Sequence, residues 1–233
     1  MGGFSGHDLA CIRSERIVFA GLGFALAPGE ALILTGPNGS GKSSLLRLMA
    51  GIAPPAAGLL RWNGAPVADD REGFSAGTLY LGHRDAVKPA LSVRENLAFH
   101  MAVRAGGAAP ENGPGAGLDG ALDRLGLSAL ADMPARLLSA GQTRRLALAR
   151  VLATPATLWL LDEPTIALDA PSVAAVVDAI AGHRAAGGMV VASTNIALPI
   201  GEAGTLDVSD FAVAQDALWG PDQRRIPAGA DSS

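Results

Sequence analysis

The chain has 233 residues, 49% of them hydrophobic and 17% charged, which suits one ordinary domain with a substantial core or two small ones. The formal net charge is −4 without any run of Lys and Arg, so the composition argues against a nucleic-acid partner. A single cysteine, Cys11, excludes an internal disulfide framework and fits a reducing compartment.

The apolar stretches of the chain are too short for a membrane-spanning helix, which needs ~20 mostly apolar residues. The N-terminus does not have the charged-then-apolar layout of a signal peptide. We therefore expect a soluble chain that contacts a membrane only through a partner.

The first third of the chain alternates short apolar runs with a helical pattern, which is typical of an α/β fold. The Asn63-Gly64 pair after an apolar run predicts a tight hairpin. Strands, some joined by turns, are expected at residues 8–26, 31–35, 59–62 and 78–81, and a helix at 41–50.

From Ser92 onward the pattern becomes mainly helical, and Ser92 with Glu95 predicts a capping box at a helix start. A Gly- and Pro-rich loop is expected at 105–117, helices at 118–125, 139–153 and 172–185, and strands at 158–161 and 189–193. We expect one nucleotide-binding domain at 7–212, with a helical subdomain at about 85–150, and a loose tail at 213–233.

The most specific motif is a phosphate-binding loop of the form G-x-x-x-x-G-K-[ST] between an expected strand and an expected helix. Its glycines let backbone N–H groups surround a phosphate, and the helix N-terminus adds partial positive charge. Lys42 is expected to reach the β- and γ-phosphates of ATP, and the Ser43 hydroxyl to bind Mg²⁺. The predicted ATP-binding residues of this loop are Gly36, Pro37, Asn38, Gly39, Ser40, Gly41, Lys42, Ser43 and Ser44.

An acidic pair, Asp162 and Glu163, ends the apolar strand expected at 158–161. Strands of a parallel sheet present their carboxyl ends to the ligand. We therefore expect Asp162 to hold Mg²⁺ or its water and Glu163 to act as the general base toward the attacking water.

A third motif lies between these two, twenty-three residues before Asp162, and consists of Leu138, Ser139, Ala140, Gly141 and Gln142. It resembles the L-S-G-G-Q signature of ABC ATPases, with Ala140 as a small departure. The resemblance covers about residues 8–200 and implies a phosphate-loop α/β core with an N-terminal antiparallel β portion and a helical subdomain. It also implies that two subunits enclose two ATP molecules head to tail, with Ser139 and Gly141 serving the ATP of the partner.

The resemblance assigns two further residues. Asp169 falls in the family's D-loop, through which the two sites communicate. Arg13 stands where the family usually places an aromatic ring against adenine, and a guanidinium can also stack on a base.

Two positions depart from the family's general pattern. His83 occupies the place of the Q-loop glutamine, and Asn195 the place of the switch histidine that contacts the γ-phosphate. Asn195 can donate a hydrogen bond but carries no positive charge and loses the imidazole's link to the base, so slow hydrolysis is expected. Both positions are nevertheless counted among the catalytic residues, beside Glu163 and Lys42.

The segment Gly82-His83 with Lys88, together with the form of the signature, is most similar to the heme-exporter ATPases of bacterial cytochrome c biogenesis. In that subfamily histidine is the usual residue at the position of His83. The similarity implies a peripheral subunit on the cytoplasmic face of the inner membrane, paired with integral membrane permease subunits.

Three alternatives stay open at this point. The chain can be the ATPase of another ABC transporter, for lipid, drug or ion. The second alternative is a non-transport ABC ATPase. Such proteins usually have two cassettes or a long coiled-coil insertion, and this chain has neither. The last alternative is a nucleotide-binding structural subunit with little turnover, for which Asn195 is the only evidence.

Overall fold

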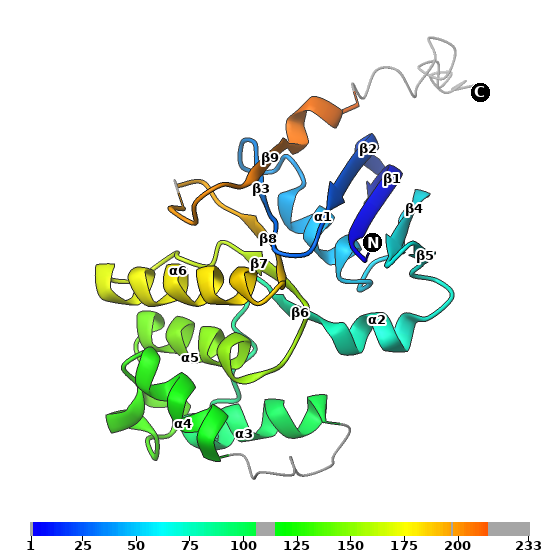
Figure 1. The fold of residues 1–233 in the computed structure, drawn as a ribbon. Coiled ribbons are helices and arrows are strands. Elements are labelled where there is room, and N and C mark those ends of the chain that lie inside the picture. Colours follow the sequence, from blue (N-terminus) through cyan, green and yellow to red (C-terminus); the bar gives the residue numbers. More distant parts are fainter. Residues whose placement is uncertain (1, 106–114, 197, 214–233) are drawn as a thin grey trace, which may run out of the picture.

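The structure is a computed structural model that describes residues 2–105, 115–196 and 198–213, and it folds around two sheets (Figure 1). The strands are β1 Phe4–Arg13, β2 Arg16–Leu26, β3 Ala31–Thr35, β4 Ala57–Trp62, β5 Ala65–Pro66, β6 Thr78–Leu81, β7 Leu158–Asp162, β8 Met189–Ser193 and β9 Gly204–Asp207. The α-helices are α1 Lys42–Met49, α2 Arg71–Gly77, α3 Val93–Arg104, α4 Gly115–Arg124, α5 Ala140–Ala153 and α6 Ala170–Ala185. Short 3-10 helices are η1 Ser128–Leu130, η2 Ala135–Leu137 and η3 Val208–Phe211.

The N-terminal sheet is antiparallel, with the strand order β2-β1-β4-β5. Asn63 and Gly64 both have positive φ, at 52° and 86°, so they form the tight turn that the sequence predicts between β4 and β5. The aromatic rings of Phe4, Trp62 and Phe74 pack together between this sheet and α2.

The second sheet is parallel, with the strand order β6-β7-β8-β3-β9. Successive side chains of a strand point to opposite faces, and both faces of β7 are buried. Leu158 and Leu160 face the core shared with α1 and the antiparallel sheet, whereas Trp159 and Leu161 face helices α5 and α6. The carboxyl ends of all these strands consequently meet at one edge of the sheet.

Helices α3, α4 and α5 form the helical part of the molecule, lowest in Figure 1, below α6. The capping box at Ser92 and Glu95 is present as predicted, and a second one begins α5 at Ser139 and Gln142. Buried residues such as Leu97, Leu122 and Leu146 join these helices to the core under the parallel sheet.

Most expected elements are confirmed, and the strands at 31–35, 78–81 and 189–193 agree residue for residue. One expectation is wrong: residues 115–117 are the first turn of α4 and not loop, because the helix that buries Leu118 and Ala121 extends through these glycines. Residues 106–114 of the expected loop and residues 214–233 of the expected tail lie outside the described residues. None of the helices in the described part of the chain is long and apolar enough to cross a bilayer.

One α-helix and one strand, as well as the short 3-10 helices, were not predicted from the sequence. Helix α2 is capped by Asp70, whose side chain accepts a hydrogen bond from the Gly73 amide, and the helix buries only Phe74. Strand β9 adds to the edge of the parallel sheet beside β3 and leads into η3.

Candidate functional site

The phosphate loop connects β3 to α1 at the carboxyl edge of the parallel sheet. Gly36 and Gly41 have φ values of 121° and 108°, which side chains rarely tolerate. A Cβ atom on Gly41 would stand 2.6 Å from Cγ1 of Val18, so the loop passes directly against β2. Glycine is therefore required at position 41 both for its backbone conformation and for its lack of a side chain.

Lys42 is buried, with 7% of its surface exposed, and its ammonium group is held by the loop itself. Nζ donates hydrogen bonds to the carbonyl oxygens of Gly36 at 2.6 Å and Pro37 at 3.1 Å. These two bonds place the ammonium group inside the loop.

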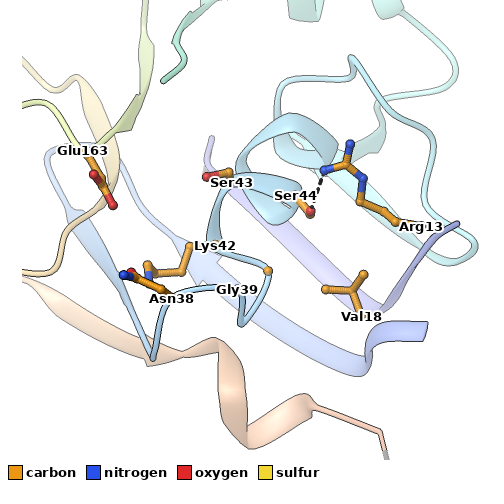
Figure 2. Close-up of a pocket in the computed structure, with 9 residues that line it drawn as sticks. Arg13, Val18, Asn38, Gly39, Lys42, Ser43, Ser44 and Glu163 are labelled. Carbon is orange, nitrogen blue, oxygen red and sulfur yellow. Dashed lines mark hydrogen bonds between the residues drawn. The ribbon is translucent and has the colours of Figure 1, made fainter. Parts of the chain in front are cut away.

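A cavity of about 340 Å³ opens over the loop (Figure 2). Its lining combines the loop with a residue from the end of β7 and two from the antiparallel sheet. The lining residues are Arg13, Val18, Asn38, Gly39, Gly41, Lys42, Ser43, Ser44 and Glu163. Arg13 lines the cavity, and its Nη1 donates a hydrogen bond to the Ser44 hydroxyl at 3.4 Å.

Asp162 lies beneath the cavity and is only 1% exposed. Its Oδ1 accepts hydrogen bonds from the hydroxyls of Ser43 at 3.0 Å and Ser193 at 2.7 Å. Its Oδ2 is buried and has no hydrogen-bond partner among the described residues. A buried carboxylate oxygen beside a hydroxyl, without a donor of its own, fits the hard oxygen ligands that Mg²⁺ takes at such a site.

Glu163 has a left-handed backbone, with φ at 47°, at the point where β7 ends. Its amide donates to Ser193, whose carbonyl and hydroxyl oxygens each lie 3.1 Å away. These bonds turn the side chain toward the cavity, where Oε1 accepts a hydrogen bond from Nδ2 of Asn195 at 2.9 Å. Asn195 Nδ2 also donates to Oδ1 of Asn38 in the phosphate loop at 3.0 Å.

The expectation that Asn195 loses contact with the base is therefore wrong. The amide is long enough to reach Glu163 from the end of β8, because β7 and β8 are neighbours in register at Asp162 and Ser193. What the amide does lack is a titratable positive charge.

His83 follows β6 at the same edge of the sheet, but its side chain is exposed and does not line the cavity. The signature residues Ser139 and Ala140 are also exposed and outside the cavity. The Ser139 hydroxyl instead accepts a hydrogen bond from the Gln142 amide at 3.2 Å, which caps α5.

Asp169 caps α6 by accepting a hydrogen bond from the Ser172 amide at 3.0 Å. Hydrogen bonds from the side chain and backbone of Ser172 lower the pKa of its carboxyl. The Ala167 carbonyl, just before Asp169, would lie 3.1 Å from a Cβ atom on Gly141, so the start of the signature helix packs on this segment.

Several residues around the site were not found from the sequence. In the sequence, Ser193 looks like the ordinary end of an apolar strand, and Val18 looks like a core residue. Asp207 ends the unpredicted strand β9, and its Oδ1 would lie 2.9 Å from a Cβ atom on Gly36. Hydrogen bonds from the side chain and backbone of Ser209 lower the pKa of Asp207.

A family model described as ABC transporter matches residues 19–166, which contain the phosphate loop, the signature and the acidic pair. The chain belongs to the ABC transporter family. The matched range includes Lys42, Asp162 and Glu163, which the structure brings together at or beneath the cavity.

Relatives of similar length are ATP-binding export proteins by name. The chain is 55% identical to the cytochrome c biogenesis ATP-binding export protein CcmA of Paramagnetospirillum magneticum, over 91% of this chain and 97% of that protein. It is 53% identical to the protein of the same name from Rhodospirillum rubrum, over 90% of this chain and 87% of that one.

Solved structures confirm the predicted fold. A protein from Pyrococcus furiosus described as an ABC transporter ATP-binding protein superposes with a TM-score of 0.76 at 23% identity. The superposition covers 91% of this chain and all of that one. The phosphate-loop α/β core with an antiparallel β portion is thus the architecture of an ABC ATPase domain.

Proposed function

We propose that this chain is the ATP-binding and ATP-hydrolysing subunit of an ABC transporter that powers heme export or release in cytochrome c biogenesis. The observation that carries the proposal is the convergence of Lys42, Ser43, Asp162 and Glu163 at one cavity. The names of the relatives support the cytochrome c pathway, and the sequence resemblance around Gly82 and His83 supports heme as the cargo.

In the proposed mechanism, Lys42 exchanges its bonds to the Gly36 and Pro37 carbonyls for bonds to phosphate oxygens of ATP. Backbone amides of the loop and the start of α1 bind the remaining phosphate charge. Ser43 and Asp162 would hold Mg²⁺, which supplies charge neutralisation at the phosphates when bound. Such electrostatic positioning accounts for most of the expected rate enhancement.

Glu163 is the proposed general base, and its carboxylate faces the cavity that the γ-phosphate would share with the attacking water. Asn195 orients that carboxylate through the 2.9 Å hydrogen bond and ties it to the phosphate loop through Asn38. The amide therefore takes over the orienting part of the role usually played by a switch histidine, without its charge.

The proposed partners are a second copy of the chain and integral membrane permease subunits. Ser139 and Ala140 lie exposed outside the chain's own cavity, which supports their use on the ATP of an opposing subunit in a head-to-tail sandwich. Asp169 would connect the two sites. We propose residues 7–212 as the nucleotide-binding domain, with the helical subdomain at 85–150 docking the permease on the cytoplasmic face of the inner membrane and 213–233 as a tail.

The first test is ATP hydrolysis by the purified chain, with and without its membrane partner, beside Lys42→Ala, Glu163→Gln and Asn195→His variants. We expect Lys42→Ala to abolish nucleotide-dependent function and Glu163→Gln to trap an ATP-bound dimer. Parent-like turnover by Glu163→Gln would show that Glu163 is not the base. ATP binding without turnover in every form would favour the alternative of a nucleotide-binding structural subunit.

The cargo needs a separate test, because another ABC exporter would pass the first one. A bacterium that lacks its cytochrome c biogenesis ATPase should regain holocytochrome c when it expresses this chain, and should not regain it with Lys42→Ala. Expression without recovery would point to an ABC exporter with a different cargo.

A further inference from the structure

A buried guanidinium lies behind the catalytic edge, by which we mean the carboxyl edge of the parallel sheet where Asp162 and Glu163 lie. Arg144 extends from α5, and its side chain is only 4% exposed. Its Nη1 donates to the Gly82 carbonyl at 3.1 Å and to Oδ1 of Asp85 at 2.8 Å. Its Nη2 donates to the carbonyls of Asp162 and Glu163, each at 2.7 Å. One side chain therefore bonds to the ends of two neighbouring strands and to the loop that follows β6.

Three of these four bonds go to backbone carbonyls. Losing any of the four would leave part of a buried cation without a hydrogen-bond partner, which costs folding free energy. A buried guanidinium must be desolvated, and Asp85 is its only carboxylate partner among the described residues. Four charge-assisted hydrogen bonds from Nη1 and Nη2 offset part of that cost, whereas Nε is buried and has no partner among the described residues. A lysine ammonium, which has no planar fork, could not reach the same set of acceptors.

Arg144 holds a backbone segment that is strained at Glu163. Glu163 has φ at 47°, and its amide is already fixed by Ser193. Arg144 fixes the carbonyl at the other end of the same residue and the carbonyl of Asp162 before it. A conformation of this kind persists only where its surroundings over-determine it. The direction of the Glu163 side chain therefore depends on bonds at both of its peptide groups.

We infer that Arg144 is a positioning residue that sets the Glu163 carboxylate for hydrolysis and links it to the signature helix and to the loop carrying His83. Arg144 lies five residues after Ser139, about 7.5 Å along the axis of α5 at the rise of an α-helix. A movement of the loop at Gly82 and Asp85, or of α5, would therefore displace the Arg144 guanidinium and, through it, the backbone of Glu163. This inference rests on the proposed ATPase function.

The chain offers a matched control in Arg184 of α6. Its guanidinium also bonds three backbone carbonyls, those of Gly29, Ile200 and Glu202. These carbonyls precede β3 and β9, at the amino edge of the sheet, away from the cavity. Arg184→Met removes the same kind of contact without touching the catalytic edge.

The catalytic arm compares ATP turnover and ATP affinity at a temperature where every variant is folded. Arg144→Met should lower kcat about 100-fold, the usual effect of an ~1 Å misplacement, while the Kd for ATP stays within about threefold. Arg144→Lys should restore only part of kcat, and Arg184→Met should keep parental kcat despite a lower Tm. Adding Arg144→Met to Glu163→Gln should cause no further loss if Arg144 acts through the base.

The structural arm needs no turnover and measures amide hydrogen exchange in the chain without nucleotide. Arg144→Met should speed exchange of the Glu163 amide by at least about tenfold while Val190 in the neighbouring strand stays protected. Unchanged protection at Glu163, or an equal loss of kcat in Arg144→Met and Arg184→Met, overturns the inference. A parent chain without turnover would count against the proposed function, while the exchange result would still decide whether Arg144 holds this backbone.

Discussion

Nδ2 of Asn195 lies 2.9 Å from the Glu163 carboxylate and 3.0 Å from the Asn38 side chain, so one neutral amide joins the end of β8 to the proposed base and to the phosphate loop. We predict that Asn195→Ala lowers kcat for ATP hydrolysis by roughly tenfold, because it removes a hydrogen bond to a charged group worth about 1.5 kcal/mol. Asn195→Asp should be worse than Asn195→Ala, since two carboxylates would then share the space. Steady-state kinetics of both variants at saturating ATP and Mg²⁺ measure this, and parental turnover by Asn195→Asp would contradict it.

The Ser193 hydroxyl donates to Asp162 Oδ1 at 2.7 Å without lining the cavity. Groups that orient a metal ligand typically change metal affinity when they are removed, and we expect Ser193→Ala to raise the Mg²⁺ concentration for half-maximal hydrolysis roughly tenfold. Ser43→Ala, which removes a proposed ligand, should have the larger effect. A Mg²⁺ titration of ATPase activity tests both, and weaker ATP binding by Ser193→Ala in the absence of Mg²⁺ would show that the hydroxyl acts on the loop instead.

Glycines 41 and 182 should respond oppositely to alanine. At Gly41 the added Cβ would meet Cγ1 of Val18 at 2.6 Å, in a left-handed backbone, so Gly41→Ala should unfold more easily and lose ATP binding. At Gly182, in the last turn of α6, the new Cβ meets nothing within 4 Å among the described residues. Gly182→Ala should raise the free energy of unfolding by about 0.5–1 kcal/mol and leave ATP binding unchanged. Thermal unfolding and ATP titration measure both effects, and a stable, ATP-binding Gly41→Ala would refute the assignment of the loop.

His183 stacks on Trp159 with ring centroids 3.9 Å apart and an interplanar angle of 4°. Burial lowers the pKa of this imidazole below its ordinary value of 6.5. The unfolded chain therefore binds a proton at mildly acid pH that the folded chain does not, so stability is full above about pH 6.5 and falls as the pH drops below it. His183→Phe should keep the stacked ring and flatten this part of the profile. Denaturant unfolding at a series of pH values checks it, and an unchanged slope would assign the acid lability to another group.

Much of the fold followed from local patterns. The strands of the parallel sheet were predictable because they are buried on both faces and read as continuous apolar runs, as in Leu158–Asp162. Helix α2 and strand β9 were not, since Arg71–Gly77 buries a single side chain and Gly204–Asp207 is an edge strand with little buried surface. Their positions depend on contacts with distant strands that periodicity does not report.

The candidate site likewise contains residues that the sequence predicts and residues that only the fold reveals. Lys42, Ser43 and Asp162 belong to contiguous motifs, and their chemistry dictates their spacing. Arg144 lies inside a helix with an ordinary sequence, and only the fold shows that it reaches the end of β7. The bond between Asn195 and Glu163 likewise depends on which strands are neighbours.

At Glu163, the left-handed backbone makes the residue needed for ATP hydrolysis different from the residue that would make the fold most stable. A glutamate costs folding free energy at φ 47°, and a glycine would relieve it while removing the carboxylate. The Glu163→Gly chain should therefore resist denaturant better than the parent and hydrolyse no ATP. If so, selection keeps a less stable protein here for the sake of one acid group, and stabilising substitutions at this position would be purged as soon as transport is needed.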